Sequence, residues 1–89
     1  MRRVKIRVFG RVQGVFFRAS ARAKAQSLAV SGNAVNLPDG SVEIIAEANE
    51  ADLAQFIDWC HLGPSKAKVD KVEVVEIIAD EILNGFETG

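Results

Sequence analysis

The chain has few residues of the kinds that build disulfide frameworks, metal sites or membrane spans. Its 89 residues include one cysteine, one histidine, one tryptophan and two prolines. Because Cys60 is the sole cysteine, an internal disulfide is excluded, and with only His61 beside it a zinc site lacks ligands. No hydrophobic run is long enough to span a bilayer, and the first residues lack the apolar stretch of a signal peptide. We therefore expect a soluble, cytoplasmic protein without a metal ion or cofactor.

Acidic residues are missing from the first part of the chain. None precedes Asp39, whereas arginines and lysines are frequent there, so the net charge of −1 conceals a strong asymmetry. A basic half favours an anionic partner through electrostatic steering and local concentration. For four of these residues individually, a solvated surface is the simpler interpretation: Arg2, Arg3, Arg22 and Lys24.

Hydrophobic spacing predicts an alternation of strands and helices. Strands are expected around 4–8 and over 32–37, 41–48 and 68–78, and helices over 17–29 and from about 50 to 62, with a further short strand possible near Phe86. The order strand, helix, strand, strand, helix, strand is typical of a ferredoxin-like α/β sandwich (βαββαβ). We expect an α+β fold in one domain over residues 1–89, with an antiparallel sheet and two helices on one of its faces.

Local signals mark the turns and the helix ends. Pro38-Asp39-Gly40 predicts a tight turn, so the strands on either side of it form a hairpin. Asn49 is a candidate N-cap of the second helix, with Asp52 as its capping partner. Gly63-Pro64 is expected to end that helix, and His61 just before it is expected to contact the last carbonyl groups.

The turn between the first strand and the first helix has the features of an anion site. Gly10 and Gly14 permit a close approach of the backbone to a ligand. Free amides at a helix start favour negative charge, and Arg18 offers a planar fork that matches phosphate oxygens in pairs. A plain turn followed by a solvated arginine explains the same spacing, because glycine-containing turns are common. The spacing alone leaves both interpretations open.

Three segments together resemble the acylphosphatase family: residues 10–18, 32–43 and 63–69. The resemblance extends from Val4 to Phe86 and implies hydrolysis of small acyl phosphates to a carboxylate and inorganic phosphate. By this resemblance Arg18 binds the phosphate and Asn36 orients the attacking water. The resemblance also implies that loop amides hold the phosphate, namely those of Gln13, Gly14, Val15, Phe16 and Phe17. We expect a monomer without a nucleic-acid or membrane partner.

The chemistry of an acyl phosphate suits this set of residues. No carboxylate or thiol close to Arg18 in the sequence offers a general base. The leaving carboxylate has a pKa of about 4 to 5, so it departs without being protonated. Phosphoryl transfer mainly needs positioning and charge stabilisation, and the family resemblance suggests that the proton of the water passes to the phosphate itself. An asparagine such as Asn36 can hold that water without taking its proton.

A noncatalytic anion-binding module is the alternative. RNA binding on an open sheet face requires aromatic stacking platforms, and the strand over 41–47 has none and carries two acids. A regulatory domain fused to an enzyme is disfavoured by the short chain. Either module would bind its ligand without hydrolysing it, and a phosphate-release assay distinguishes them from an enzyme.

The sequence departs from the family pattern at Asn33, Val35 and Ala48 and in the tail over 86–89, which lacks the usual arginine and tyrosine. None of these differences is expected to touch Arg18 or Asn36. They are expected to affect stability and packing around the second strand more than the reaction class.

Overall fold

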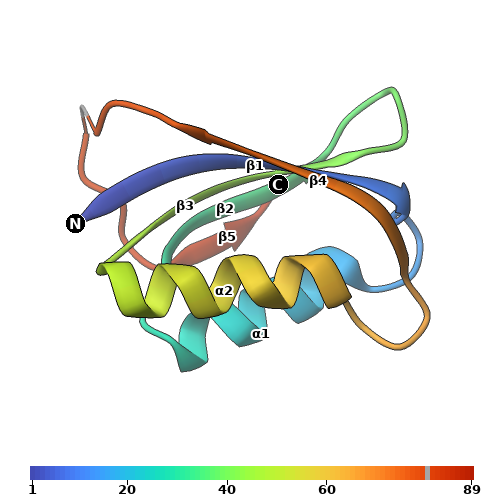
Figure 1. Ribbon diagram of the computed structural model, residues 1–89, viewed down its shortest axis with the longest axis horizontal. Helices are drawn as coiled ribbons and strands as arrows, with labels where there is room; N and C mark the ends of the chain where they lie inside the picture. The colour runs from blue at the N-terminus through green and yellow to red at the C-terminus, as the bar shows by residue number, and fades with distance from the viewer. Residues whose placement is uncertain (80) are drawn as a thin grey trace.

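The computed structural model describes residues 1–79 and 81–89, in which two helices lie on one face of a sheet (Figure 1). The elements are β1 (Arg2–Arg11), α1 (Phe17–Ser27), β2 (Ser31–Asn36), β3 (Val42–Ala48), α2 (Glu50–Leu62), β4 (Lys68–Glu76) and β5 (Phe86–Thr88). The predicted ferredoxin-like order is confirmed, with element bounds shifted by a few residues. Within the described residues, neither helix combines the length and the apolar character needed to cross a membrane.

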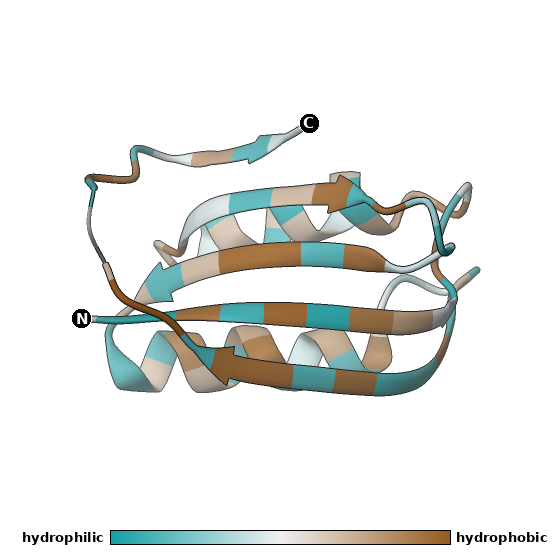
Figure 2. Cartoon of the chain, turned by 90° about the horizontal axis from the view of Figure 1, so that it is seen from above, coloured by the Kyte–Doolittle hydropathy of each residue, from teal (hydrophilic) through white to brown (hydrophobic). Residues whose placement is uncertain are grey.

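An antiparallel sheet had been predicted, but the sheet is mixed. Its strand order is β4-β1-β3-β2-β5, and the first four strands pair antiparallel. β5 pairs parallel with β2, with Gly32 opposite Phe86 and Ala34 opposite Thr88. The chain leaves β4 at the end of the sheet where β2 begins and crosses to the far edge at that end (Figure 2). A strand that starts there has to run in the direction of β2.

The core lies between the sheet and the two helices. Apolar and polar residues alternate along the central strands (Figure 2), so that one face of each strand is buried. Burial raises the pKa of the Cys60 thiol to about 12, which agrees with its expected place in the core. Trp59 covers the edge of α2, with its ring centroid 5.3 Å from that of Phe17 and 6.2 Å from that of Phe56. The main core side chains of β1, β3 and the helices are Val4, Ile6, Val8, Ile44, Ala46, Phe17, Ala21, Ala25, Leu53, Phe56 and Cys60.

Basic residues of β1 form ion pairs with acidic residues on neighbouring elements. Arg3 is buried and its Nε lies 3.1 Å from Glu47 Oε1 of β3. Arg2 is 2.9 Å from Glu76 of β4 and 3.1 Å from Glu50 of α2. A solvated surface was therefore the wrong interpretation for Arg3, whereas Arg2 pairs with its acidic partners at the exposed surface. The reason is that β3 and β4, which come from the acidic part of the chain, flank β1 on both sides.

Gly32 allows β2 to approach β3 more closely than any other residue would. Its φ is +153°, and a Cβ atom there would lie 1.7 Å from the carbonyl oxygen of Ile45.

We predict that Gly32→Ala lowers the free energy of unfolding by about 2–4 kcal/mol, because the backbone has to move to make room for the Cβ atom. Gly85→Ala is the control: Gly85 has a φ of +68° but no atom within 4 Å of the Cβ position, so only the left-handed backbone costs energy, about 1 kcal/mol. Urea unfolding measures both, and equal losses would contradict the steric explanation.

Candidate active site

The loop between β1 and α1 is anchored by a buried side chain at each end. Val12 and Phe17 are both 1% exposed. Between them, Gly14 and Phe16 have left-handed backbones, with φ values of +75° and +65°. This conformation costs a residue other than glycine about 1–2 kcal/mol, so the packing of the neighbouring Phe17 has to hold Phe16 in it. Gly63 of the α2 terminus makes room for Phe17, because a Cβ atom there would lie 2.9 Å from the Phe17 ring.

The N-terminus of α1 has no side-chain cap. Its N-cap is Phe16, which provides no side-chain cap, and the first turn contains no acidic residue. The first backbone bond of the helix runs from the Ser20 N–H to the Phe16 carbonyl at 3.0 Å. The N–H groups of Phe17, Arg18 and Ala19 therefore remain for an external acceptor, and the helix dipole favours an anionic one.

The second helix has the opposite arrangement. Asn49 Oδ1 accepts a hydrogen bond from the Asp52 N–H at 2.9 Å, which confirms the predicted N-cap. Glu50 and Asp52 occupy its first turn, so negative charge is already present there. At its other end, His61 Nδ1 lies 3.0 Å from the Ile57 carbonyl oxygen, as expected for a histidine in a last turn. Of the two helices, only α1 presents an N-terminus suited to an anion.

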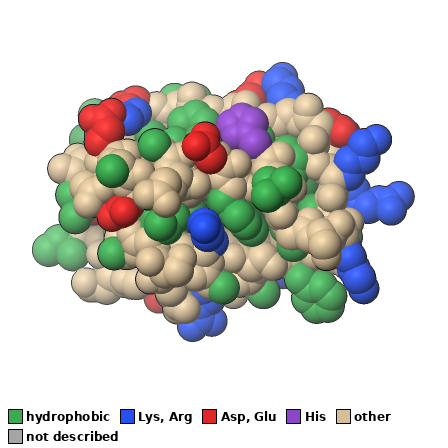
Figure 3. Space-filling view, turned by 60° about the horizontal axis from the view of Figure 1, so that its bottom comes forward, with side chains coloured by type: hydrophobic (Ala, Val, Ile, Leu, Met, Phe, Trp, Pro, Cys, Tyr) green, Lys and Arg blue, Asp and Glu red, His purple; other side chains and the backbone are tan. Residues whose placement is uncertain are grey.

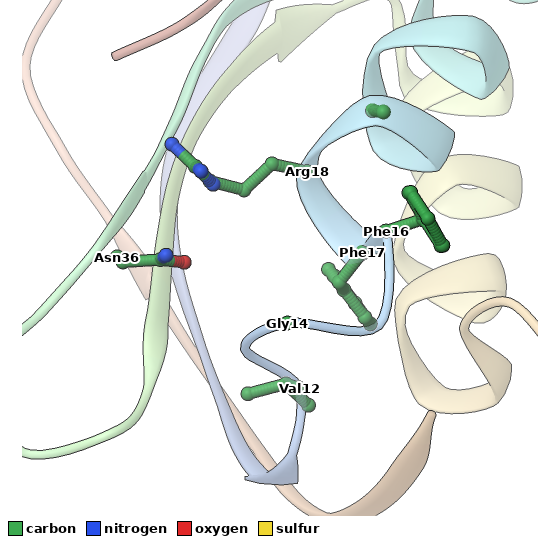
Figure 4. A pocket seen from close by; sticks show the side chains of 7 residues that line it. Val12, Gly14, Phe16, Phe17, Arg18 and Asn36 are labelled. Atoms are coloured by element: carbon green, nitrogen blue, oxygen red, sulfur yellow. The ribbon is translucent and has the colours of Figure 1, made fainter. Parts of the chain in front are cut away.

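A pocket of about 250 Å³ opens between this loop, the start of α1 and the end of β2. Figure 4 shows Arg18 extending from the first turn of α1 toward the strand that carries Asn36. The structure thus places both predicted catalytic residues at one pocket, although they belong to different elements. The pocket is lined by Val12, Gly14, Phe16, Phe17, Arg18, Ala19 and Asn36.

Two lining residues were not among the predicted site residues, and two predicted residues do not line the pocket. Val12 and Ala19 lie immediately outside the predicted segment 13–18. Their position next to that segment was the only sequence feature that could have identified them as pocket residues. Val15 packs against the core instead of facing the pocket. Gln13 directs its amide to the hairpin between β2 and β3. For these two residues, the prediction of a phosphate contact rests on their backbone amides.

Arg18 is held by the tail of the chain. Its Nη1 atom donates a hydrogen bond to the Gly89 carbonyl oxygen at 3.1 Å. The expectation that the divergent tail leaves Arg18 untouched was therefore wrong. The parallel pairing of β5 with β2 is the cause, because it carries the chain past β2 toward the start of α1. One donor of the guanidinium orients the side chain, and the others remain for a ligand.

Positive charge surrounds this end of the molecule. Figure 3 shows lysine and arginine side chains gathered at the end where α1 begins and α2 finishes. The segments that meet there carry Arg11, Lys66 and Lys68, and no ion pair within residues 1–79 and 81–89 includes any of the three. In that same part of the chain, no group of three or more His, Cys, Asp or Glu residues is arranged to hold a metal ion. The end of the molecule that carries the pocket is therefore suited to attract an anion.

The fold and the pocket define a small ferredoxin-like α+β protein with a pocket at the uncapped start of its first helix. The sequence profile described as acylphosphatase matches residues 4–88. An acylphosphatase of Rubrobacter xylanophilus is 49% identical over 86 residues, covering 97% of this chain and 78% of that protein. The chain belongs to the acylphosphatase family of hydrolases.

Solved structures of acylphosphatases also resemble this chain. The crystal structure of an acylphosphatase from Bacillus subtilis matches with a TM-score of 0.95 and 35% identity, covering 100% of this chain and 99% of that one. Full-length HypF in a phosphate- and nucleotide-bound form matches with a TM-score of 0.86 and 27% identity. That match covers 99% of this chain and 12% of HypF, so the same fold also occurs as a small part of a much longer protein.

The turn after Asn36 contains a carboxylate whose ionisation supports the hairpin. Asp39 Oδ1 accepts hydrogen bonds from the Ser41 N–H at 2.9 Å and from Ser41 Oγ at 2.5 Å. These bonds, first the side-chain one and then the backbone one, lower the pKa of Asp39. Because the folded pKa lies below the unfolded one, the stabilisation is present above the unfolded value and is lost as the pH falls through the folded value.

We predict that Asp39→Asn is less stable than the wild type at pH 7 and that the difference shrinks as the pH falls below about 4. Urea unfolding of both proteins between pH 7 and pH 2 measures this difference. Asp58→Asn, which removes an exposed carboxylate from α2, serves as the control. A difference between Asp39→Asn and wild type that stays constant with pH would contradict the assignment.

Proposed function

We propose that the protein hydrolyses the carboxyl–phosphate bond of small acyl phosphates, releasing a carboxylate and inorganic phosphate. The observation that carries the proposal is the shared pocket of Arg18, Asn36 and the uncapped start of α1. Family membership supports the reaction class, since the Rubrobacter xylanophilus protein and the Bacillus subtilis structure are both named acylphosphatases.

The phosphate group would bind at the start of α1. The Arg18 guanidinium pairs with two phosphate oxygens, while the amides of residues 13–17 and of the first helical turn donate to the others. These donors are fixed in place before the substrate arrives, so they stabilise the charge of the transition state without reorganising. They also bind the product phosphate, which carries the same oxygens.

Asn36 would hold the attacking water. Its amide supplies both a donor and an acceptor, so it orients the water without removing a proton. The water oxygen attacks phosphorus, the bond between phosphorus and the acyl oxygen breaks, and its electron pair leaves with the carboxylate. The proton of the water passes to a phosphate oxygen. The carboxylate needs no general acid because of its low pKa.

The open face of the sheet speaks against the RNA-binding alternative. Arg7 of β1 lies 3.2 Å from Glu43, and Lys5 Nζ lies 3.8 Å from the same carboxylate, so neighbouring acids offset these positive charges. β3 contributes no aromatic side chain. These charges and the lack of aromatic residues on β3 disfavour a nucleic-acid partner. We further propose that the enzyme is monomeric and cytoplasmic, that one domain over residues 1–89 forms it, and that it uses no metal ion or cofactor.

The two catalytic assignments predict different kinetic changes. Arg18 binds phosphate in the ground state and the transition state, whereas Asn36 contacts only the water. Asn36→Ala should therefore lower kcat about 10²-fold and leave inhibition by inorganic phosphate nearly unchanged. Arg18→Ala should lower kcat and also weaken the inhibition by inorganic phosphate. Steady-state kinetics with acetyl phosphate, with and without inorganic phosphate, measure the two effects.

Asn33→Ala is the matched control, because Asn33 lies on the same strand but does not line the pocket. It should leave both constants near their wild-type values. If Asn36→Ala weakens phosphate inhibition as much as Arg18→Ala does, Asn36 is a phosphate ligand and its proposed role is wrong.

Lysine at position 18 tests the geometry of the guanidinium. Arg18→Lys keeps the positive charge but loses the paired donors, so we predict a fall in kcat/KM of about 10²–10³-fold, nearly as large as that of Arg18→Ala. Arg22→Lys, at an exposed position of α1, should change kcat/KM little. A lysine variant with near-wild-type turnover would show that charge alone is sufficient.

A further inference from the structure

The side chain of Gln13 joins the loop after β1 to the hairpin formed by β2 and β3. Its Nε2 atom lies 2.8 Å from the Leu37 carbonyl oxygen and 2.9 Å from the Ser41 carbonyl oxygen. An amide NH₂ group has two hydrogen atoms, so both of them donate to the hairpin. Gln13 is half-buried and does not line the pocket. Its side chain therefore acts between two segments of the protein rather than on a ligand.

The two acceptor carbonyls lie at the base of the hairpin, beside Asn36. Leu37 directly follows Asn36, and Ser41 directly precedes Val42, which is the cross-strand partner of Asn36. The Leu37 N–H also donates to the Ser41 carbonyl oxygen at 2.9 Å. The side-chain amide of Gln13 thus contacts the two residues that adjoin the Asn36–Val42 pair, one just after β2 and one just before β3.

The strand ladder does not supply this connection. β3 lies between β1 and β2 in the sheet, so β1 and β2 share no ladder hydrogen bonds. The loop that follows β1 is joined to the strand that carries Asn36 indirectly through β3, and directly through the two bonds of Gln13. These bonds run between the two halves of the pocket.

We propose that Gln13 is a positioning residue that fixes Asn36 relative to the phosphate-binding loop. The proposal rests on the function proposed above, in which the loop binds the phosphate and Asn36 orients the water. An in-line attack requires the water opposite the leaving group, and a misplacement of about 1 Å costs about 10²-fold in rate. Loss of the side-chain amide of Gln13 frees Asn36 from the loop but leaves Arg18 and the start of α1 in place. The loss should therefore appear in kcat and not in phosphate binding.

A double-mutant cycle tests this role. Gln13→Met keeps a side chain of similar length but has no donor, so kcat for acetyl phosphate should fall about 10–100-fold, while the inhibition constant of inorganic phosphate changes less than about threefold. In the Asn36→Ala background the same substitution should cost less than about twofold, because the group it positions is gone. Gln55→Met, at an exposed position of α2, is the matched control and should change neither constant.

Gln13→Glu adds a measurement that reduced stability alone does not mimic. The ionised carboxylate has no donor and faces two carbonyl oxygens, whereas the protonated carboxyl regains one donor. The ratio of its kcat to that of the wild type at the same pH should therefore rise as the pH falls toward about 4. Gln55→Glu should show a constant ratio.

Two results would overturn the positioning role. One is an equal loss from Gln13→Met in the wild-type and Asn36→Ala backgrounds, and the other is a phosphate inhibition constant that rises as much as kcat falls. If Gln13→Met does not fold, the pH series of Gln13→Glu decides, and a flat ratio refutes the role. Wild-type kcat in Asn36→Ala alone would instead refute the proposed function of Asn36, and the role of Gln13 would fall with it.

Discussion

Burial of Val12 and Phe17 at the two ends of one loop is the constraint on which the pocket depends. Between them, Val15 packs against the core, while Gly14 and Phe16 are exposed and have left-handed backbones. The anchors belong to the core that fixes β1 against α1. Because Phe17 is also the first residue of α1, its burial sets where the free N–H groups of that helix point. The position of the pocket is thus a consequence of core packing rather than of contacts within the loop.

Charge is divided along the chain in a way that serves both folding and binding. The basic residues of β1 are offset by acids from β3, β4 and α2, so much of the asymmetry seen in the sequence is internal to the fold. The exposed pairs among them, such as those of Arg2, contribute little stability, about 0–1 kcal/mol each, whereas the Arg3–Glu47 pair is largely buried. Part of the positive charge that remains lies in the segments near the pocket, which include Arg11, Lys66 and Lys68 (Figure 3). An anionic substrate therefore meets its attractive field at the pocket rather than across the sheet.

The sequence allowed the element order, the N-cap at Asn49 and the meeting of Arg18 with Asn36 to be predicted, because these follow from local patterns and a family resemblance. It did not allow the direction of β5 to be predicted, which is set by where the chain crosses the sheet. The bond from Arg18 to Gly89 depends on that direction and was missed with it. The bonds of Gln13 were missed for a similar reason, since a glutamine in a loop carries no signal of the distant carbonyl groups to which it donates.

The two groups assigned to the reaction are supported from different parts of the fold. Arg18 is oriented by the tail that follows β5, and the strand end that carries Asn36 is contacted by Gln13 from the loop after β1. Both contacts are long-range and neither passes through the other. The tail also pairs with β2, the strand that carries Asn36, and the Gly89 N–H donates to the Ala34 carbonyl oxygen at 3.1 Å, so the tail supports the strand of Asn36 as well as Arg18. The group that Arg18 contacts in the tail is a backbone carbonyl, which is present whatever the side chain, so this contact places no demand on the side chains over 86–89.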